Sequence, residues 1–96
     1  MKIDFNKNEE NLILYLDGRI DSLTVIDFDD FLKSNLTGIK FVTIDCEKLT
    51  YISSAGLRVL LSLKKKLANC LTLINVQELV MEIFEVTGFV DILEIK

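Results

Sequence analysis

Two kinds of hydrophobic spacing alternate along this 96-residue chain, and the alternation limits the folds that it can adopt. Short apolar runs typical of strands are followed by longer segments in which apolar residues recur at helical spacing. A strand, a helix and a further strand in succession form a right-handed crossover, which pairs the strands in parallel. The expected strands are 2–5, 11–17, 40–46 and 70–75, and the expected helices are 24–37, 53–68 and 77–86.

The first two strands are separated only by a polar turn at 6–10, which is too short for a crossover. We therefore expect an antiparallel hairpin at the start of the sheet. The apolar stretch 89–95 is expected to cover the last helix or to add a small strand. The predicted fold class is α/β, with a single domain over residues 1–96, a mixed and mainly parallel central sheet, and helices packed against it.

Local patterns refine two of these elements. In strand 11–17, leucines at alternate positions are interleaved with Ile13 and Tyr15, so both faces are mostly apolar, as in a central strand. At the start of the first helix, Thr24 followed by Asp27 resembles a capping box with Asp in place of the usual Glu. We therefore expect Thr24 to cap that helix.

The charge balance disfavours some classes of function. Lys and Arg number 11 against 15 Asp and Glu, which gives a formal net charge of −4. Binding to nucleic acid depends on clustered basic residues, so no nucleic-acid role is expected. The apolar runs are too short for a membrane span and no signal-peptide pattern opens the sequence, so a cytoplasmic protein is expected.

The sequence contains no histidine, which removes the commonest general base and the commonest zinc ligand. No nucleophile–base pair, metal cluster or glycine-rich phosphate loop occurs either, so we expect no enzyme, no cofactor and no metal site. Cys46 and Cys70 stand singly, each beside an apolar run, and are expected to be reduced core thiols. A bridge between them stays open as the alternative.

Two adjacent serines, Ser53 and Ser54, stand where a turn leads directly into helix 53–68. Backbone N–H groups are unpaired at a helix start, and the helix dipole makes that end attractive to anions. The serines could cap the helix, bind a phosphorylated ligand, or become phosphorylated. Ser54 lies one turn before Arg58 on the polar stripe of the helix, so it should be exposed.

Three segments are expected to meet at the carboxyl ends of the parallel strands, where open α/β sheets carry their sites. They are the loop 18–22, Asp45 near the end of strand 40–46, and the Ser53–Ser54 pair. Asp21 in the first of these segments could equally be a loop-stabilising residue.

Short motifs occur in a fixed order along nearly the whole chain: Gly18-Arg19-Ile20-Asp21, Asp45, Tyr51-Ile52-Ser53-Ser54-Ala55-Gly56-Leu57 and Phe84-Glu85-Val86-Thr87-Gly88-Phe89. This ordered set resembles the STAS domain, especially the stand-alone anti-sigma factor antagonists of bacteria. In that family the helix-start motif is commonly Asp-Ser-Ser/Thr-Gly-Leu, and its first serine accepts phosphate from a partner kinase. Aligning the Gly-Leu pairs places Ser54 on the acceptor and Ser53 on the Asp, which is a departure from the commonest pattern.

The resemblance implies a partner-switching regulator of transcription. The unphosphorylated form would bind a GHKL-type serine-kinase anti-sigma factor and free the sigma factor. Phosphorylation of Ser54 by that kinase would abolish binding, and a PPM-type serine phosphatase would restore it. Arg58 could pair with the phosphate, and no membrane partner is implied. The residues expected near the phosphosite or in partner contact are Asp21, Ser53, Arg58, Gly56 and Asp45.

Rival functions make different predictions. A response-regulator receiver would use Asp45 as the acceptor with bound Mg²⁺, but the chain is short for that fold and lacks its paired acids. A STAS subunit of a lipid or anion transporter would share the fold without regulation by phosphorylation. The protein that binds the chain, a kinase-like ATP-binding protein or a transporter ATPase, distinguishes the two STAS alternatives.

Overall fold

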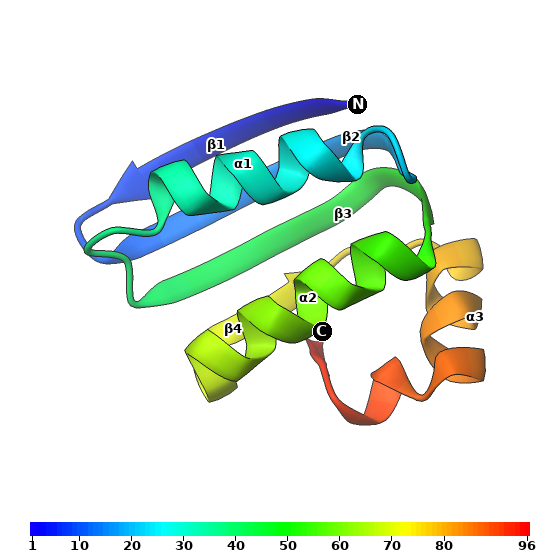
Figure 1. Ribbon diagram of the computed structural model, residues 1–96. Coiled ribbons are helices and arrows are strands. Elements are labelled where there is room, and N and C mark those ends of the chain that lie inside the picture. Colours follow the sequence, from blue (N-terminus) through cyan, green and yellow to red (C-terminus); the bar gives the residue numbers. More distant parts are fainter.

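The strands of the single five-stranded sheet follow one another in sequence order, β1-β2-β3-β4-β5 (Figure 1). The computed structural model describes residues 1–96. The first two strands pair antiparallel and the others pair parallel, which confirms the predicted fold class. The strands are β1 (Lys2–Asn8), β2 (Asn11–Ile20), β3 (Phe41–Ile52), β4 (Leu71–Ile74) and β5 (Glu94–Ile95), and the helices are α1 (Val25–Asn35), α2 (Ser54–Leu67) and α3 (Glu78–Thr87). Short 3₁₀ turns, Ala68–Cys70 and Phe89–Asp91, follow α2 and α3.

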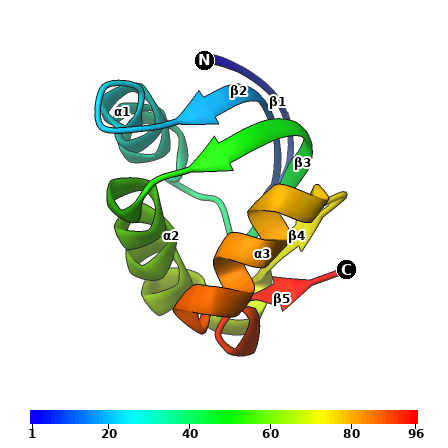
Figure 2. The same ribbon diagram turned by 90° about the vertical axis from the view of Figure 1, so that its right-hand side faces the viewer.

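All three helices lie on the same face of the sheet (Figure 2). Right-handed crossovers that always step in the same direction along a sheet place every helix on the same side. In β2 the alternate residues Leu12, Leu14 and Leu16 are buried, whereas Ile13 is half-buried and Tyr15 is exposed. The prediction of a central strand is confirmed, because β2 pairs with β1 on one side and with β3 on the other, but only one of its two apolar faces is covered.

The core is a single cluster of 19 buried apolar residues between this covered face and the helices. Phe28 on α1 and Phe84 on α3 have no exposed surface, and α2 contributes Leu57, Leu60 and Leu63. Leu79 on α3 is apolar but 52% exposed, because the residues of this helix that are buried in the core are Val80 and Phe84. None of the helices is long and apolar enough to cross a membrane.

Strand β3 is much longer than the expected strand 40–46 and continues to Ile52. Its second half pairs with β2, with two register shifts in which β3 carries extra residues. Such bulges bend and twist a strand, and here both Leu49 and Ile52 are buried. Asp45 therefore lies in the middle of β3, roughly 20 Å before its end, and the prediction that it stands near the carboxyl end is wrong.

The first hairpin is also tighter than expected. β1 extends to Asn8, so the turn consists of Glu9 and Glu10 alone, with Glu9 at a positive φ of 57°. The 89–95 stretch supplies β5, which pairs with β4.

The two cysteines are free, and they differ in burial. Cys46 has no exposed surface, and its burial raises the pKa of the thiol to about 12 from the usual 9.0, with a smaller contribution from the charge of Asp45. Cys70 is partly exposed.

This difference predicts unequal alkylation. Because the thiolate is the reactive form, the raised pKa alone lowers the reactive fraction of Cys46 about a thousandfold below pH 9. Iodoacetamide at pH 8 should modify Cys70 first and reach Cys46 only when the domain unfolds. Peptide mass spectrometry with and without urea measures this, and equal labelling of both residues in the absence of denaturant would contradict the burial.

Candidate functional site

The start of α2 is held by Ser53, which caps the helix. Ser53 has extended backbone angles, and its Oγ accepts a hydrogen bond of 3.3 Å from the backbone N–H of Gly56. Its own N–H donates to the carbonyl of Ile20 at 2.8 Å, which ties the cap to the end of β2. Ser therefore performs here the capping that Asp can perform in the commoner family motif.

Ser54 is the first residue of α2, and its side chain is exposed, as predicted. The first turn of the helix contains no acidic residue. The positive end of the helix dipole is therefore not compensated by a carboxylate on the helix itself. Arg58 lies one turn further along and is also exposed. This arrangement can accept a negative charge at Ser54 without unfolding the helix start.

Gly56 is a buried residue of α2, on the side of the helix that faces the ends of β2 and β3. A Cβ at this position would lie 2.7 Å from Cγ2 of Ile20 and 2.7 Å from Cγ1 of Ile52. Only a residue without a side chain allows α2 to approach the ends of β2 and β3 this closely. These two isoleucines directly precede Asp21 and Ser53, so the same contact sets the spacing of the site.

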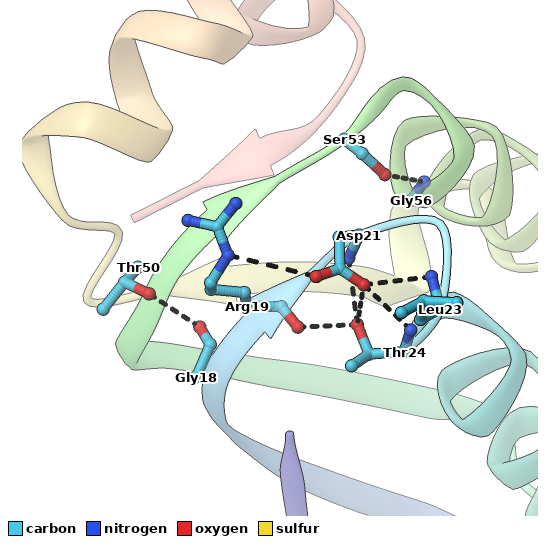
Figure 3. A network of polar contacts seen from close by, with 8 residues as sticks. All are labelled: Gly18, Arg19, Asp21, Leu23, Thr24, Thr50, Ser53 and Gly56. Carbon is cyan, nitrogen blue, oxygen red and sulfur yellow. Dashed lines mark hydrogen bonds and ion pairs between the residues drawn. The ribbon is translucent and has the colours of Figure 1, made fainter.

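Asp21 organises the loop between β2 and α1 (Figure 3). Its Oδ1 accepts hydrogen bonds from the backbone N–H groups of Leu23 and Thr24, both at 3.0 Å. Thr24 Oγ1 accepts from the N–H of Asp21 at 2.9 Å and donates to the carbonyl of Arg19 at 2.7 Å. The expected capping box is wrong: Thr24 makes no side-chain cap, because its hydroxyl serves this loop instead.

Hydrogen bonds from the backbone N–H groups of Thr24 and then of Leu23 lower the pKa of Asp21, with a further contribution from Arg19. A carboxylate whose pKa is lowered on folding stabilises the fold above its unfolded pKa, and this stabilisation is lost as the pH falls through the folded pKa.

We therefore expect Asp21→Ala to lower the melting temperature at pH 7, and the difference from wild type to shrink once the pH falls below the ordinary pKa of 3.8. Thermal denaturation at a series of pH values measures this difference. Asp30→Ala, which removes an exposed carboxylate outside this loop, is the control and should change the melting temperature little. A difference for Asp21→Ala that is independent of pH would contradict the role of the ionised carboxylate.

Arg19 stands beside this network. Its guanidinium lies over the ring of Tyr51, 4.5 Å from the centroid, and its Nε is 4.0 Å from Oδ2 of Asp21. The neighbouring Thr50 Oγ1 donates to the carbonyl of Gly18 at 3.0 Å. The ends of β2 and β3 are therefore joined by side chains as well as by the sheet.

Sequence patterns missed two exposed aliphatic residues in the same region. Leu23 is 79% exposed in the loop that Asp21 organises, and Ile26 is 60% exposed on the first turn of α1. Leu23 stands between polar residues, and Ile26 falls outside the apolar stripe of α1. These two features of the sequence could have indicated that both side chains are exposed.

The site therefore gathers Asp21, Ser53, Ser54, Gly56 and Arg58 at the end of the molecule where β2 and β3 finish (Figures 1 and 2). Asp45 does not belong to this group. Its Oδ1 accepts from the N–H of Glu47 at 3.0 Å and its Oδ2 accepts from Nδ2 of Asn75 at 3.3 Å. It lines the largest surface hollow, about 450 Å³, on the uncovered face of the sheet together with Lys2, Asp4, Tyr15, Leu16, Asp17, Glu47 and Lys48. None of the residues at the α2 start lines that hollow.

Over nearly its whole length the chain is similar to proteins of a known family. The model of the STAS domain family matches residues 2–96. A protein of Bordetella bronchiseptica, BtrV, named as a candidate anti-sigma factor antagonist, is 35% identical over 96 residues, which covers 96% of this chain and 83% of that protein.

Solved structures share the fold at low sequence identity. Unphosphorylated SpoIIAA, an anti-sigma factor antagonist, superposes with a TM-score of 0.82 at 16% identity, over 99% of this chain and 88% of that one. A candidate anti-sigma factor antagonist from Thermotoga maritima gives a TM-score of 0.86 at 15% identity, over 97% and 84%. SpoIIAA of Bacillus in its phosphorylated form gives 0.73 at 15% identity, over 99% and 91%.

Proposed function

Since the chain belongs to the STAS domain family and, within it, to the anti-sigma factor antagonists, we propose that it acts by partner switching through Ser54. The unphosphorylated protein binds an anti-sigma factor that is itself a GHKL-type serine kinase, and thereby frees a sigma factor. Transfer of the γ-phosphate of ATP to Ser54 Oγ ends this binding. A PPM-type serine phosphatase hydrolyses the phosphoserine and restores it.

The single observation that carries the proposal is the exposed position of Ser54 on the first turn of α2. Of the two serines, Ser53 already uses its hydroxyl to cap Gly56, so Ser54 is the better acceptor. A kinase can reach an exposed side chain at a helix start without opening the core.

Electrostatics explains why the modification would act at the interface. A phosphoserine adds about −1.5 to −2 charges, which the N–H groups of a helix start stabilise within the domain. A partner surface that is complementary to the neutral hydroxyl of Ser54 would not be complementary to a dianion, so phosphorylation would weaken binding. The exposed Leu23 and Ile26 lie in the adjoining loop and helix start and offer apolar contacts to the same partner.

The proposal is tested by incubating the protein with candidate kinase anti-sigma factors from its source organism and ATP, followed by mass spectrometry. We expect one added phosphate on Ser54, none in Ser54→Ala, and unchanged phosphorylation of Ser53→Ala. Phosphate on Ser53 alone would show that the acceptor is misassigned. Capture of a transporter ATPase in place of a kinase would favour the transporter-subunit function and overturn the proposal.

A further inference from the structure

The outer face of α3 is acidic and apolar, and the site at the start of α2 does not include it. Positions 78, 79, 82, 85 and 86 lie on the side of the helix opposite the buried Val80 and Phe84. We call this the α3 outer face; it consists of Glu78, Leu79, Glu82, Glu85 and Val86, all exposed. Leu79 is 52% and Val86 is 84% exposed, and the helix carries no basic residue.

The negative charge of the protein is concentrated in the same segment. Residues 1–70 contain ten basic and ten acidic side chains, whereas residues 71–96 contain one basic and five acidic ones. The whole formal charge of −4 therefore comes from the last 26 residues. All four ion pairs in the protein lie outside α3, so the glutamates of its outer face are not neutralised within the chain.

The α3 outer face is also within reach of a partner that binds over Ser54. Helix α3 and the N-terminal end of α2 lie at the same end of the molecule in both views (Figures 1 and 2). A specific interface covers about 800 Å² on each partner, roughly one seventh of the 5582 Å² surface of this domain. The molecule measures 34 × 26 × 20 Å, so such a footprint occupies most of one end.

We propose that the α3 outer face is a second docking surface for the same anti-sigma factor, and that it binds a segment carrying Lys or Arg beside aliphatic residues. This inference rests on the proposed function and adds the chemistry of the partner. Glu78, Glu82 and Glu85 select the basic side chains, and Leu79 and Val86 are covered on binding. Charge complementarity of this kind favours fast association and discriminates against acidic surfaces.

The test measures the Kd of the purified anti-sigma factor for the full-length protein and its variants at low and high salt. We expect Glu82→Lys to weaken binding at least about tenfold at low salt, and less at high salt because screening weakens charge interactions. Val86→Ser should weaken binding about threefold. Glu10→Lys, the same charge reversal in the β1–β2 turn at the far end of the molecule, is the matched control and should change the Kd less than about twofold (Figure 1).

The outcomes separate this inference from the proposed function. If Ser54→Asp loses binding while Glu82→Lys and Val86→Ser bind like wild type, the second docking surface is wrong and the proposed function stands. If Ser54→Asp also binds like wild type, the proposed function itself fails. Sedimentation of the protein alone is the remaining check: a dimer that Glu82→Lys or Val86→Ser dissociates would show that a second copy covers this face, and would overturn the proposal.

Discussion

Replacing Gly56 by valine is expected to destabilise the domain by at least about 3 kcal/mol, at the upper end of the cost of overpacking a core. The first carbon of the new side chain would meet Ile20 and Ile52 at 2.7 Å, which is well inside van der Waals contact. Both neighbours belong to the buried core and have at most 1% exposed surface, so they have little room to move. Chemical denaturation followed by circular dichroism measures the loss.

The matched control is Ser62→Val, which places the same side chain on the exposed face of the same helix. It measures the cost of a β-branched residue in α2 without the clash, expected to be below about 1 kcal/mol. Gly56→Ala should fall between the two, because the better helix propensity of Ala offsets part of the strain. Equal stabilities of Gly56→Val and Ser62→Val would contradict the close approach of α2 to the strands.

Ser54→Asp is expected to weaken binding to the anti-sigma factor at least about 30-fold, or about 2 kcal/mol. The substitution introduces a negative charge at the exposed first residue of α2, where we propose that the partner docks. The fold should be unaffected, because an acidic side chain is favourable in the first turn of a helix. Isothermal titration calorimetry with the purified partner measures the change in affinity.

Ser53→Asp provides a stringent control, since it adds the same charge one residue earlier. Ser53 directs its hydroxyl at the N–H of Gly56, and an Asp in its place can make the same cap. We expect this variant to keep its affinity within about threefold of wild type. Equal losses in the two variants would mean that any charge near the helix start disrupts binding, and that Ser54 has no special position.

The start of α2 could be predicted from the sequence because the signals there are local. A serine cap followed by leucines at helical spacing specifies a helix start, and the structure begins α2 at Ser54 with Ser53 as the cap. The exposure of Ser54 followed from the same spacing. Neither prediction depended on how distant segments pack.

The extent of β3 could not be predicted in this way. Residues 47–50 are mostly polar and resemble a loop, yet β3 continues through them and pairs with β2 at Lys48 and Leu49. One face of the sheet carries no helix there and tolerates polar side chains. The same open face accounts for the exposure of Tyr15, since a strand that is apolar on both faces does not reveal which of them will be covered. The predicted position of Asp45 at the end of a strand is wrong because β3 continues past it to Ile52.

In helix α3 the sequence also leaves open which apolar side chains are buried. Leu79 and Val80 are adjacent apolar residues, and the sequence does not say which of them points inward. Packing against the core selects Val80 and leaves Leu79 on the surface. A residue that looked like part of the core therefore became part of a proposed docking surface.

The most direct test of the central claim compares the wild-type protein before and after full phosphorylation of Ser54, measuring partner affinity and amide hydrogen exchange on the same samples. The account predicts that phosphorylation removes binding while exchange in the strands and in the core of α1, α2 and α3 stays unchanged, because the switch is a change of surface charge. Undiminished binding by the phosphorylated protein, or loss of binding accompanied by faster exchange throughout the sheet, would contradict it.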